Sequence, residues 1–370
     1  MLREAREQLR EKGIPYSRTM NSGHVASFLS NRTYSLGWRW KYIAPVIQTR
    51  KEAEQVVLVL TGRVRDLKNL RDPLQQKRVD RFLDKNKVVI TLTTSPIRLP
   101  KIVAVLATLD LTYVSHINVV LPRFYGPKRE EYGTIPASLA DFPKVRIIRI
   151  DTDFGPVTKM LPTIMHAKEH DPNSLIISVD DDVAYPIGMV NEFIYQKAIK
   201  HPNSVLMLGE PLPIFSYVKD MRKYWPQVRQ KRPMANIVEG WASVLYSPNL
   251  VNTDCVFRLA ALSKKCMLSD DFVISYALAQ SAVKRVAIDN QYVAAPYPYK
   301  YGTGEDALHA GRGLDEGKRK YIPNNDLINF EKYSACLENI VEYVKLVKQG
   351  GEPDVCNFRR RSPLRKVKKI

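Results

Sequence analysis

The stretch Leu175–Pro186, LIISVDDDVAYP, joins a short apolar run to three consecutive aspartates. The apolar part is rich in β-branched residues and predicts a strand that is buried on both faces of a sheet. Three adjacent carboxylates repel one another, and each costs solvation free energy where it is buried. The aspartates Asp180, Asp181 and Asp182 therefore indicate a function that requires concentrated negative charge at the end of this strand.

Three further apolar runs precede this strand and alternate with helical patterns. The runs lie within 87–96, His116–Pro122 and Val145–Asp151, and the helical patterns cover 98–113 and 158–172. This alternation predicts βαβ units and an α/β fold, with a mixed, mainly parallel, Rossmann-like sheet flanked by helices. Ligands bind such sheets at the carboxyl ends of the strands, where the three aspartates and the TTSP segment after the first run both lie.

The chain divides into a partly helical N-terminal extension (1–86), an α/β domain (87–338) and a C-terminal helix end with a basic tail (339–370). The aromatic and basic segment Tyr34–Pro45 is either a membrane-surface or acceptor-binding patch, or a set of rings that docks the extension onto the domain; we favour docking. Other expected elements are a helix in 70–87, a strand in 204–213, an aromatic run led by glycine in 239–248, a helix in 268–280, a loop in 301–313 and a long amphipathic helix in 331–350.

The composition is strongly basic, with 57 Lys and Arg against 38 Asp and Glu, a net charge of +19. Such an excess favours an anionic partner, which is a nucleic acid, a membrane surface or a phosphorylated substrate. No apolar stretch approaches the roughly 18 residues that span a bilayer, and the N-terminus has no signal-peptide core. We therefore expect a cytoplasmic protein, with membrane association through basic segments left open, and a Golgi-luminal one only if the sequence is part of a longer chain.

The four cysteines form no C-x-x-C pair, which argues against a zinc ribbon or a thioredoxin-type motif. So few cysteines in 370 residues do not suggest a disulfide scaffold. The pairing left open is a single Cys255–Cys266 bridge in an oxidising compartment.

The spacing of the three aspartates suits a divalent cation. If the chain stays extended, Asp180 and Asp182 point to one face and Asp181 points to the other. Mg²⁺ or Mn²⁺ takes one or two carboxylates, and substrate phosphate oxygens fill its remaining positions. The alternative is an acidic loop, or a cap for a helix that follows.

Two enzyme classes use a metal at such a strand end. One transfers sugars from a nucleotide diphosphate, and the other is the haloacid-dehalogenase type of phosphatase. The phosphatase motif requires Thr or Val where this chain has Ala184, and it should open the domain, whereas three strands precede it here. A basic nucleic-acid-binding protein is the alternative outside the enzymes, although no helix-turn-helix, zinc finger or RNP-type strand is visible.

Six blocks occur in an order that resembles a diverse family of D-x-D glycosyltransferases with the GT-A fold, found in bacteria, algae and large DNA viruses. The resemblance covers roughly 87–336 and leaves out the extension and the tail. The blocks are VVITLTTSPIRLPKI, DFGPVTKMLPTI, IISVDDDVAYP, EGWASVLYSP, LSDDFVISYALA and DALH.

The resemblance implies a UDP-, GDP- or TDP-linked sugar donor and a Mn²⁺ or Mg²⁺ cofactor held by Asp180 and Asp182. It implies that Asp181 reaches the ribose or the sugar. It also implies further donor-binding residues, which are Thr93, Thr94 and Ser95 on the nucleoside and Arg98 and Lys159 on the diphosphate.

On the acceptor side the resemblance implies Gly240 and Trp241, with the indole as a flat surface for a sugar ring. Asp271 is expected to take the proton of the acceptor hydroxyl, and Asp270 to orient the acceptor, which favours an inverting reaction over a retaining one. His309 is expected to add a metal or phosphate contact. The acceptor would be a glycan, a glycoprotein or a lipid-linked molecule, and no specific nucleic acid is expected.

Overall fold

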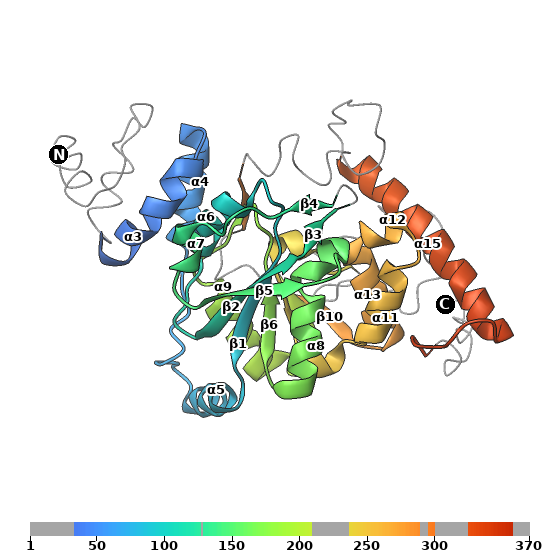
Figure 1. Cartoon of the computed structure of the whole chain (residues 1–370). Coiled ribbons are helices and arrows are strands. Elements are labelled where there is room, and N and C mark those ends of the chain that lie inside the picture. Colours follow the sequence, from blue (N-terminus) through green and yellow to red (C-terminus); the bar gives the residue numbers. More distant parts are fainter. Residues whose placement is uncertain (1–32, 127–128, 209–236, 289–294, 300–324, 358–370) are drawn as a thin grey trace.

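The computed structural model describes residues 33–126, 129–208, 237–288, 295–299 and 325–357 (Figure 1). The predicted loop at 301–313 with His309, and the basic tail from 358 onward, lie outside these residues. None of the described helices is long and apolar enough to cross a membrane.

A seven-stranded sheet forms the centre of the structure, in the order β10-β8-β9-β6-β1-β2-β5. Strand β9 runs antiparallel to its neighbours β6 and β8, and all other neighbours are parallel. The predicted mixed, mainly parallel sheet is therefore confirmed. Its strands are β1 (Val88–Leu92), β2 (Val114–Pro122), β5 (Val145–Ile150), β6 (Leu175–Ser178), β8 (Ser204–Met207), β9 (Val244–Tyr246) and β10 (Lys284–Ala287).

Two short ribbons lie beside the main sheet. In one, β3 (Phe124–Tyr125) pairs with β4 (Glu130–Glu131), and in the other β7 (Val183–Ala184) pairs with β11 (Tyr297–Pro298). Because β7 begins directly after Asp182, the second ribbon fixes the chain on the far side of the three aspartates. The backbone N–H of Tyr299 also donates to the carbonyl of Asp182 at 2.8 Å.

Helices cover both faces of the sheet, as the continuous apolar strands predict. Alternate residues of β1 enter two separate cores, with Val88, Ile90 and Leu92 in one and Val89 in the other. The first core includes α3 (Thr33–Ile43), α4 (Arg50–Leu60), α5 (Pro73–Lys85), α6 (Ile102–Leu106), α7 (Ala137–Ala140) and α9 (Met189–Tyr195). The second includes α8 (Leu161–His170), α11 (Thr253–Ala260), α12 (Lys264–Met267), α13 (Asp270–Gln280) and α15 (Asn325–Gln349).

Short single-turn segments connect these elements. They are η1 (Ala44–Val46), η2 (Leu99–Lys101), η3 (Gly155–Lys159), η4 (Gln196–Lys200), η6 (Gly240–Ala242) and η7 (Pro248–Leu250). Two of them, η3 and η6, carry residues that the sequence predicts for the site.

The N-terminal extension docks onto the first core through its aromatic segment, as expected. Trp40 is buried, and Trp38 packs against Phe142 with ring centroids 5.9 Å apart. The Arg39 guanidinium between them donates to the carbonyls of Ala107 and Leu109, both at 2.6 Å. These contacts account for the rings and the arginine without a membrane or an acceptor.

Two disulfides attach the C-terminal part of the chain to the second core. Cys255 pairs with Cys356, and Cys266 pairs with Cys336. The Cys255–Cys266 bridge that the sequence left open does not form, because each of these cysteines pairs with a cysteine far along the chain. Helix α15 carries Cys336 and continues through residue 338 without interruption.

Candidate active site

The predicted donor segments meet at the point where the strand order reverses. From β1 the chain builds outward through β2 and β5, and it then returns to place β6 on the other side of β1. Such a switch point opens a crevice at the carboxyl ends of the strands, where ligands bind in open α/β sheets. Thr94 follows β1 and Asp181 follows β6, and the Thr94 hydroxyl donates to Asp181 Oδ2 at 2.6 Å.

One arginine holds two of the three aspartates. Nη1 of Arg98 lies 2.9 Å from Asp181 Oδ1 and 3.0 Å from Asp182 Oδ2. The chain is not extended here, because β6 ends at Ser178 and a turn begins at Asp181. The expectation that Asp181 and Asp182 point to opposite faces is therefore wrong, since the turn brings both carboxylates to one guanidinium.

The three aspartates differ in how far solvent reaches them. The side chains of Asp180 and Asp182 are 27% and 18% exposed, whereas that of Asp181 is 10% exposed and contacts both Thr94 and Arg98. Asp180 and Asp182 are therefore the pair that a ligand can reach. Through its contacts with Thr94 and Arg98, Asp181 connects the ends of β1 and β6, which is a structural role in the site.

A buried lysine joins the first acidic group to the second. Nζ of Lys159 lies 2.8 Å from Asp180 Oδ1 and 2.9 Å from Asp270 Oδ2. The aspartates come from the end of β6 and the start of α13, 90 positions apart in the sequence. The structure thus brings the two predicted acidic groups together at one site.

The second acidic pair also binds the glycine of the EGWASVLYSP block. The N–H of Gly240 donates to Asp271 Oδ1 at 2.8 Å. A Cβ at position 240 would lie 2.3 Å from Lys159 Nζ and 2.9 Å from Asp271 Oδ1, so the site has no space for a side chain there. Trp241 next to it is 41% exposed, and its indole donates to Glu239 at 3.2 Å.

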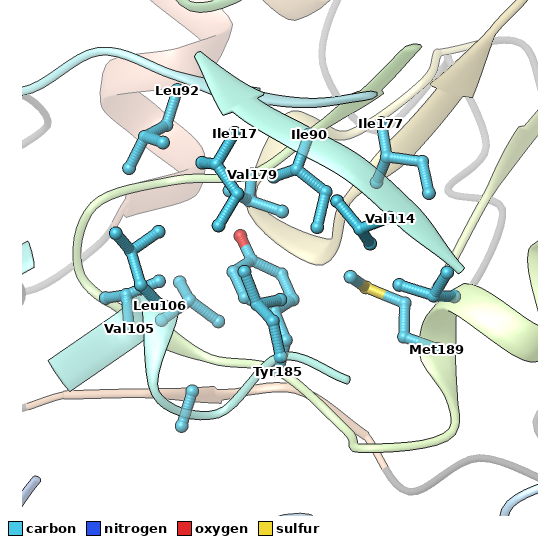
Figure 2. Packing of buried hydrophobic residues seen from close by; sticks show 14 of the residues in the cluster. Ile90, Leu92, Val105, Leu106, Val114, Ile117, Ile177, Val179, Tyr185 and Met189 are labelled. Carbon is cyan, nitrogen blue, oxygen red and sulfur yellow. The ribbon is translucent and has the colours of Figure 1, made fainter. Parts of the chain in front are cut away.

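Tyr185 is a residue that the sequence reasoning missed. Its ring is fully buried among aliphatic side chains of the first core (Figure 2). Its hydroxyl accepts from the N–H of Asp180 at 2.7 Å and donates to the carbonyl of Trp241 at 3.0 Å. The phenol therefore ties the aspartate segment to the Gly240 segment. One signal for Tyr185 was available in the sequence. It follows the three aspartates by three positions, so a turn at the aspartates could bring its hydroxyl back to their backbone.

Burial and mutual repulsion shift the pKa values of this cluster. Burial, together with the neighbouring Asp181, raises the pKa of Asp182 to about 7. Burial and the adjacent Asp270 raise the pKa of Asp271 well above its ordinary value. Burial opposes the charge of Lys159, but Asp180, Asp270 and Asp271 outweigh it, so the pKa of this lysine is raised. Lys159 therefore remains an ammonium at neutral pH.

The donor set fits a hard divalent cation. Among the described residues, four of the five carboxylates contact one of two cationic side chains, Arg98 and Lys159, whereas Asp271 accepts from the N–H of Gly240. Within the same residues no three acidic, His or Cys side chains are grouped to hold an ion by themselves. One or two carboxylates can hold such an ion together with several waters, which the phosphate oxygens of a substrate would replace.

The other predicted residues have partners within the chain. The Thr93 hydroxyl donates to the carbonyl of Val120 at 2.7 Å, and the carbonyl of Ser95 accepts from the N–H of Arg98 in a turn. Arg98 and Lys159 already pair with carboxylates, so their predicted contacts with a diphosphate stay predictions. His309 lies outside the described residues.

Comparison with known proteins gives little further guidance. No protein-family model matches this sequence, and no curated protein matches it. A solved structure with some similarity is the mannosyltransferase PcManGT from Pyrobaculum calidifontis in complex with GDP-Man and Mn²⁺. The TM-score is 0.36 at 13% identity, over 78% of this chain and 85% of that chain. A TM-score of this size establishes no shared activity, so a function must come from the residues of the site.

Proposed function

We propose that this protein is a glycosyltransferase that moves a sugar from a nucleotide-diphosphate donor to an acceptor hydroxyl with the help of Mn²⁺ or Mg²⁺. One observation supports this most: two acidic groups from distant segments lie at a single switch point and share Lys159. A transferase of this kind needs carboxylates for two separate tasks, one at the departing diphosphate and one at the incoming hydroxyl.

On the donor side, Asp180 and Asp182 would hold the cation, which neutralises charge on the leaving diphosphate when it is bound. Their partial exposure supports this assignment over Asp181, whose carboxylate is bound by Thr94 and Arg98. Arg98 keeps the Asp181–Asp182 turn in place. The segment of Thr93, Thr94 and Ser95 after β1 remains our proposed position for the nucleoside.

On the acceptor side, Asp271 is our candidate for the base. Burial and the neighbouring Asp270 raise its pKa, which makes it a stronger base than an ordinary exposed carboxylate. The N–H of Gly240 fixes one oxygen of this carboxylate. Asp270 lies next to it and would orient the acceptor. The half-exposed indole of Trp241 would offer a flat surface to a sugar ring. These roles imply an inverting reaction.

The strand order supports a GT-A type of domain within this proposal. Counted along the chain, the main sheet reads 3-2-1-4-6-5-7 from β5 to β10, with the sixth strand reversed. The first four positions follow the order of Rossmann-type sheets, which bind nucleotides at the switch between strands 1 and 4. The aspartates lie at this switch.

We further propose that the protein works in an oxidising compartment, in place of the cytosol expected from the sequence. All four cysteines are paired in two disulfides, and such bonds persist outside the reducing cytosol. Quantifying maleimide labelling of the purified, unreduced protein tests this. Four unreactive cysteines support the proposal, and four reactive thiols in freshly isolated protein oppose it.

Activity is tested by incubating the protein with a panel of UDP-, GDP- and TDP-sugars and Mn²⁺ or Mg²⁺ and measuring release of the nucleotide diphosphate. Metal-dependent release from one donor class, lost in Asp182→Ala, supports the proposal. Hydrolysis of p-nitrophenyl phosphate that requires Asp180 would support a phosphatase. Stabilisation by duplex DNA in place of any nucleotide would support a nucleic-acid-binding protein.

A further inference from the structure

Lys159 occupies the centre of the site and contacts both acidic groups. Its Nζ lies 2.8 Å from Asp180 on one side and 2.9 Å from Asp270 on the other. The lysine side chain is only 7% exposed. An ammonium that is buried and paired on two sides is poorly placed to serve as a free cation for a phosphate.

The segment before Lys159 is shaped to fix its backbone. Gly155 adopts φ +66°, and a Cβ there would lie 2.9 Å from the side chain and 3.0 Å from the carbonyl oxygen of Met267. Asp153 Oδ1 accepts from the N–H of Gly155 at 2.8 Å and stabilises this turn. The Thr91 hydroxyl then donates to the carbonyl of Lys159 at 2.6 Å. The start of the lysine side chain is thus anchored to β1, at the centre of the sheet.

The ammonium end of the Lys159 side chain is also closely packed. Gly240 leaves room for the ammonium, since a Cβ would approach Nζ to 2.3 Å. The same glycine donates its N–H to Asp271, so the backbone that makes room for Lys159 also fixes the second acidic pair. The lysine, the glycine and both acidic groups therefore form one connected unit.

We propose that Lys159 is a positioning residue that acts as an ionic bridge between the donor and the acceptor carboxylates. Without a cation, Lys159 pairs with both Asp180 and Asp270. A cation that binds Asp180 displaces the lysine from that carboxylate, and the lysine then stays paired with Asp270 alone. Binding on the donor side would then change the field at Asp270 and Asp271. This inference rests on the proposed function and assigns Lys159 a different role from the diphosphate contact that the family resemblance implies.

Titration calorimetry with Mn²⁺ alone tests the bridge without any reaction. In Lys159→Met, which removes the charge and keeps most of the volume, we expect Mn²⁺ affinity to rise about tenfold, because a competing positive charge is gone. UDP or GDP affinity at saturating Mn²⁺ should stay within about threefold of the wild-type value, since the lysine does not bind the diphosphate in this account. Lys168→Met is the matched control, because this lysine donates to the carbonyl of Val251 away from the site.

Asp270→Asn provides a second, milder variant that keeps the shape of the site. With one partner lost, Lys159 should bind Asp180 more strongly, and Mn²⁺ affinity should fall about threefold or more. In the double variant with Lys159→Met this effect of Asp270→Asn should disappear, because only the lysine transmits it. A direct influence of the Asp270 charge on the ion would persist in the double variant and would overturn the bridge.

Other outcomes also decide the question. Unchanged Mn²⁺ affinity with weaker UDP and GDP binding in Lys159→Met would show a diphosphate contact and overturn the bridge. A lower melting temperature with both affinities unchanged would show a merely structural lysine and overturn it as well. If the wild-type protein binds Mn²⁺ but neither nucleotide, the proposed function fails, while the Mn²⁺ titrations still decide the bridge.

Discussion

Gly240→Ala is the smallest change that should disable the site. The added Cβ would lie 2.3 Å from Lys159 Nζ, and an ordinary contact begins at 3.4 Å, so the ammonium must move by about 1.1 Å. The lysine backbone cannot follow, because Thr91 holds its carbonyl. The displacement must come from the side chain, and it acts on both ion pairs of Lys159 at once.

The size of the effect follows from these distances. At an effective dielectric constant of about 20, lengthening an ion pair from about 2.8 to about 3.9 Å weakens it by about 1.7 kcal/mol. A shift directed away from both Asp180 and Asp270 therefore costs at most about 3 kcal/mol, which corresponds to a drop in melting temperature of about 4 °C in a protein of this size. Misplacement of catalytic groups by about 1 Å should reduce turnover about a hundredfold.

The assay combines thermal unfolding with metal-dependent release of nucleotide diphosphate. Gly133→Ala is the matched control, because a Cβ there meets nothing within 4 Å and the position is exposed. The control should match the wild-type protein in both measurements. If Gly240→Ala unfolds at the wild-type temperature and turns over at the wild-type rate, then the close packing of Lys159, Gly240 and Asp271 has no part in the activity.

Three further substitutions test other parts of the account. Asp271→Asn should abolish transfer while donor binding persists. The pKa of Asp271 is raised in the folded state, so its charged form costs stability at any pH above its unfolded pKa. The variant should therefore melt at a higher temperature than the wild-type protein at pH 7.5, and this difference should vanish as the pH falls towards 4. Normal turnover by this variant would remove Asp271 as the base. Tyr185→Phe deletes two partly buried hydrogen bonds, so we expect a loss of about 1–3 kcal/mol in chemical denaturation and weaker metal-dependent nucleotide binding. An unchanged nucleotide affinity would leave Tyr185 a purely structural residue. Replacing Cys266 and Cys336 with Ser opens a bridge over 70 positions and should cost about 2–5 kcal/mol, whereas wild-type stability would contradict the pairing.

The sheet could be predicted because its strands carry their own signal. The apolar runs before TTSP and before the three aspartates are confirmed as β1 and β6, since a strand that is covered on both faces must be apolar throughout. The helix that begins at Asp270 and the long helix up to Gln349 are confirmed as α13 and α15. The reversed strand β9 was not foreseen, because a run of three strand residues after Gly240 shows no direction in the sequence.

The sequence predicted which residues form the site more readily than which of them contact one another. The sequence places Asp180, Lys159 and Asp270 on separate segments, and only the packing of η3 against the sheet brings the lysine between the two aspartates. The turn at Asp181 likewise depends on Arg98, which comes from another segment. Family resemblance gave these basic residues to the diphosphate, because it carries no information on which carboxylates lie nearby.

The disulfides show the same limit. The sequence left open a bridge between Cys255 and Cys266, which are close in the sequence, yet these cysteines pair with Cys356 and Cys336. That pairing depends on how α15 packs against α12 and on where the segment after α15 lies, and both are tertiary properties (Figure 1). Residue spacing alone cannot distinguish the three ways of pairing four cysteines.

The central claim is that Asp180 and Asp182 hold a divalent cation for a nucleotide diphosphate. The most direct measurement is calorimetric titration of UDP, GDP and TDP into the wild-type protein and Asp182→Ala, each with and without Mn²⁺. We predict that the wild-type protein binds one of these nucleotides only when Mn²⁺ is present, and that Asp182→Ala binds none. Equal binding with and without the metal, or undiminished binding by Asp182→Ala, would contradict the claim.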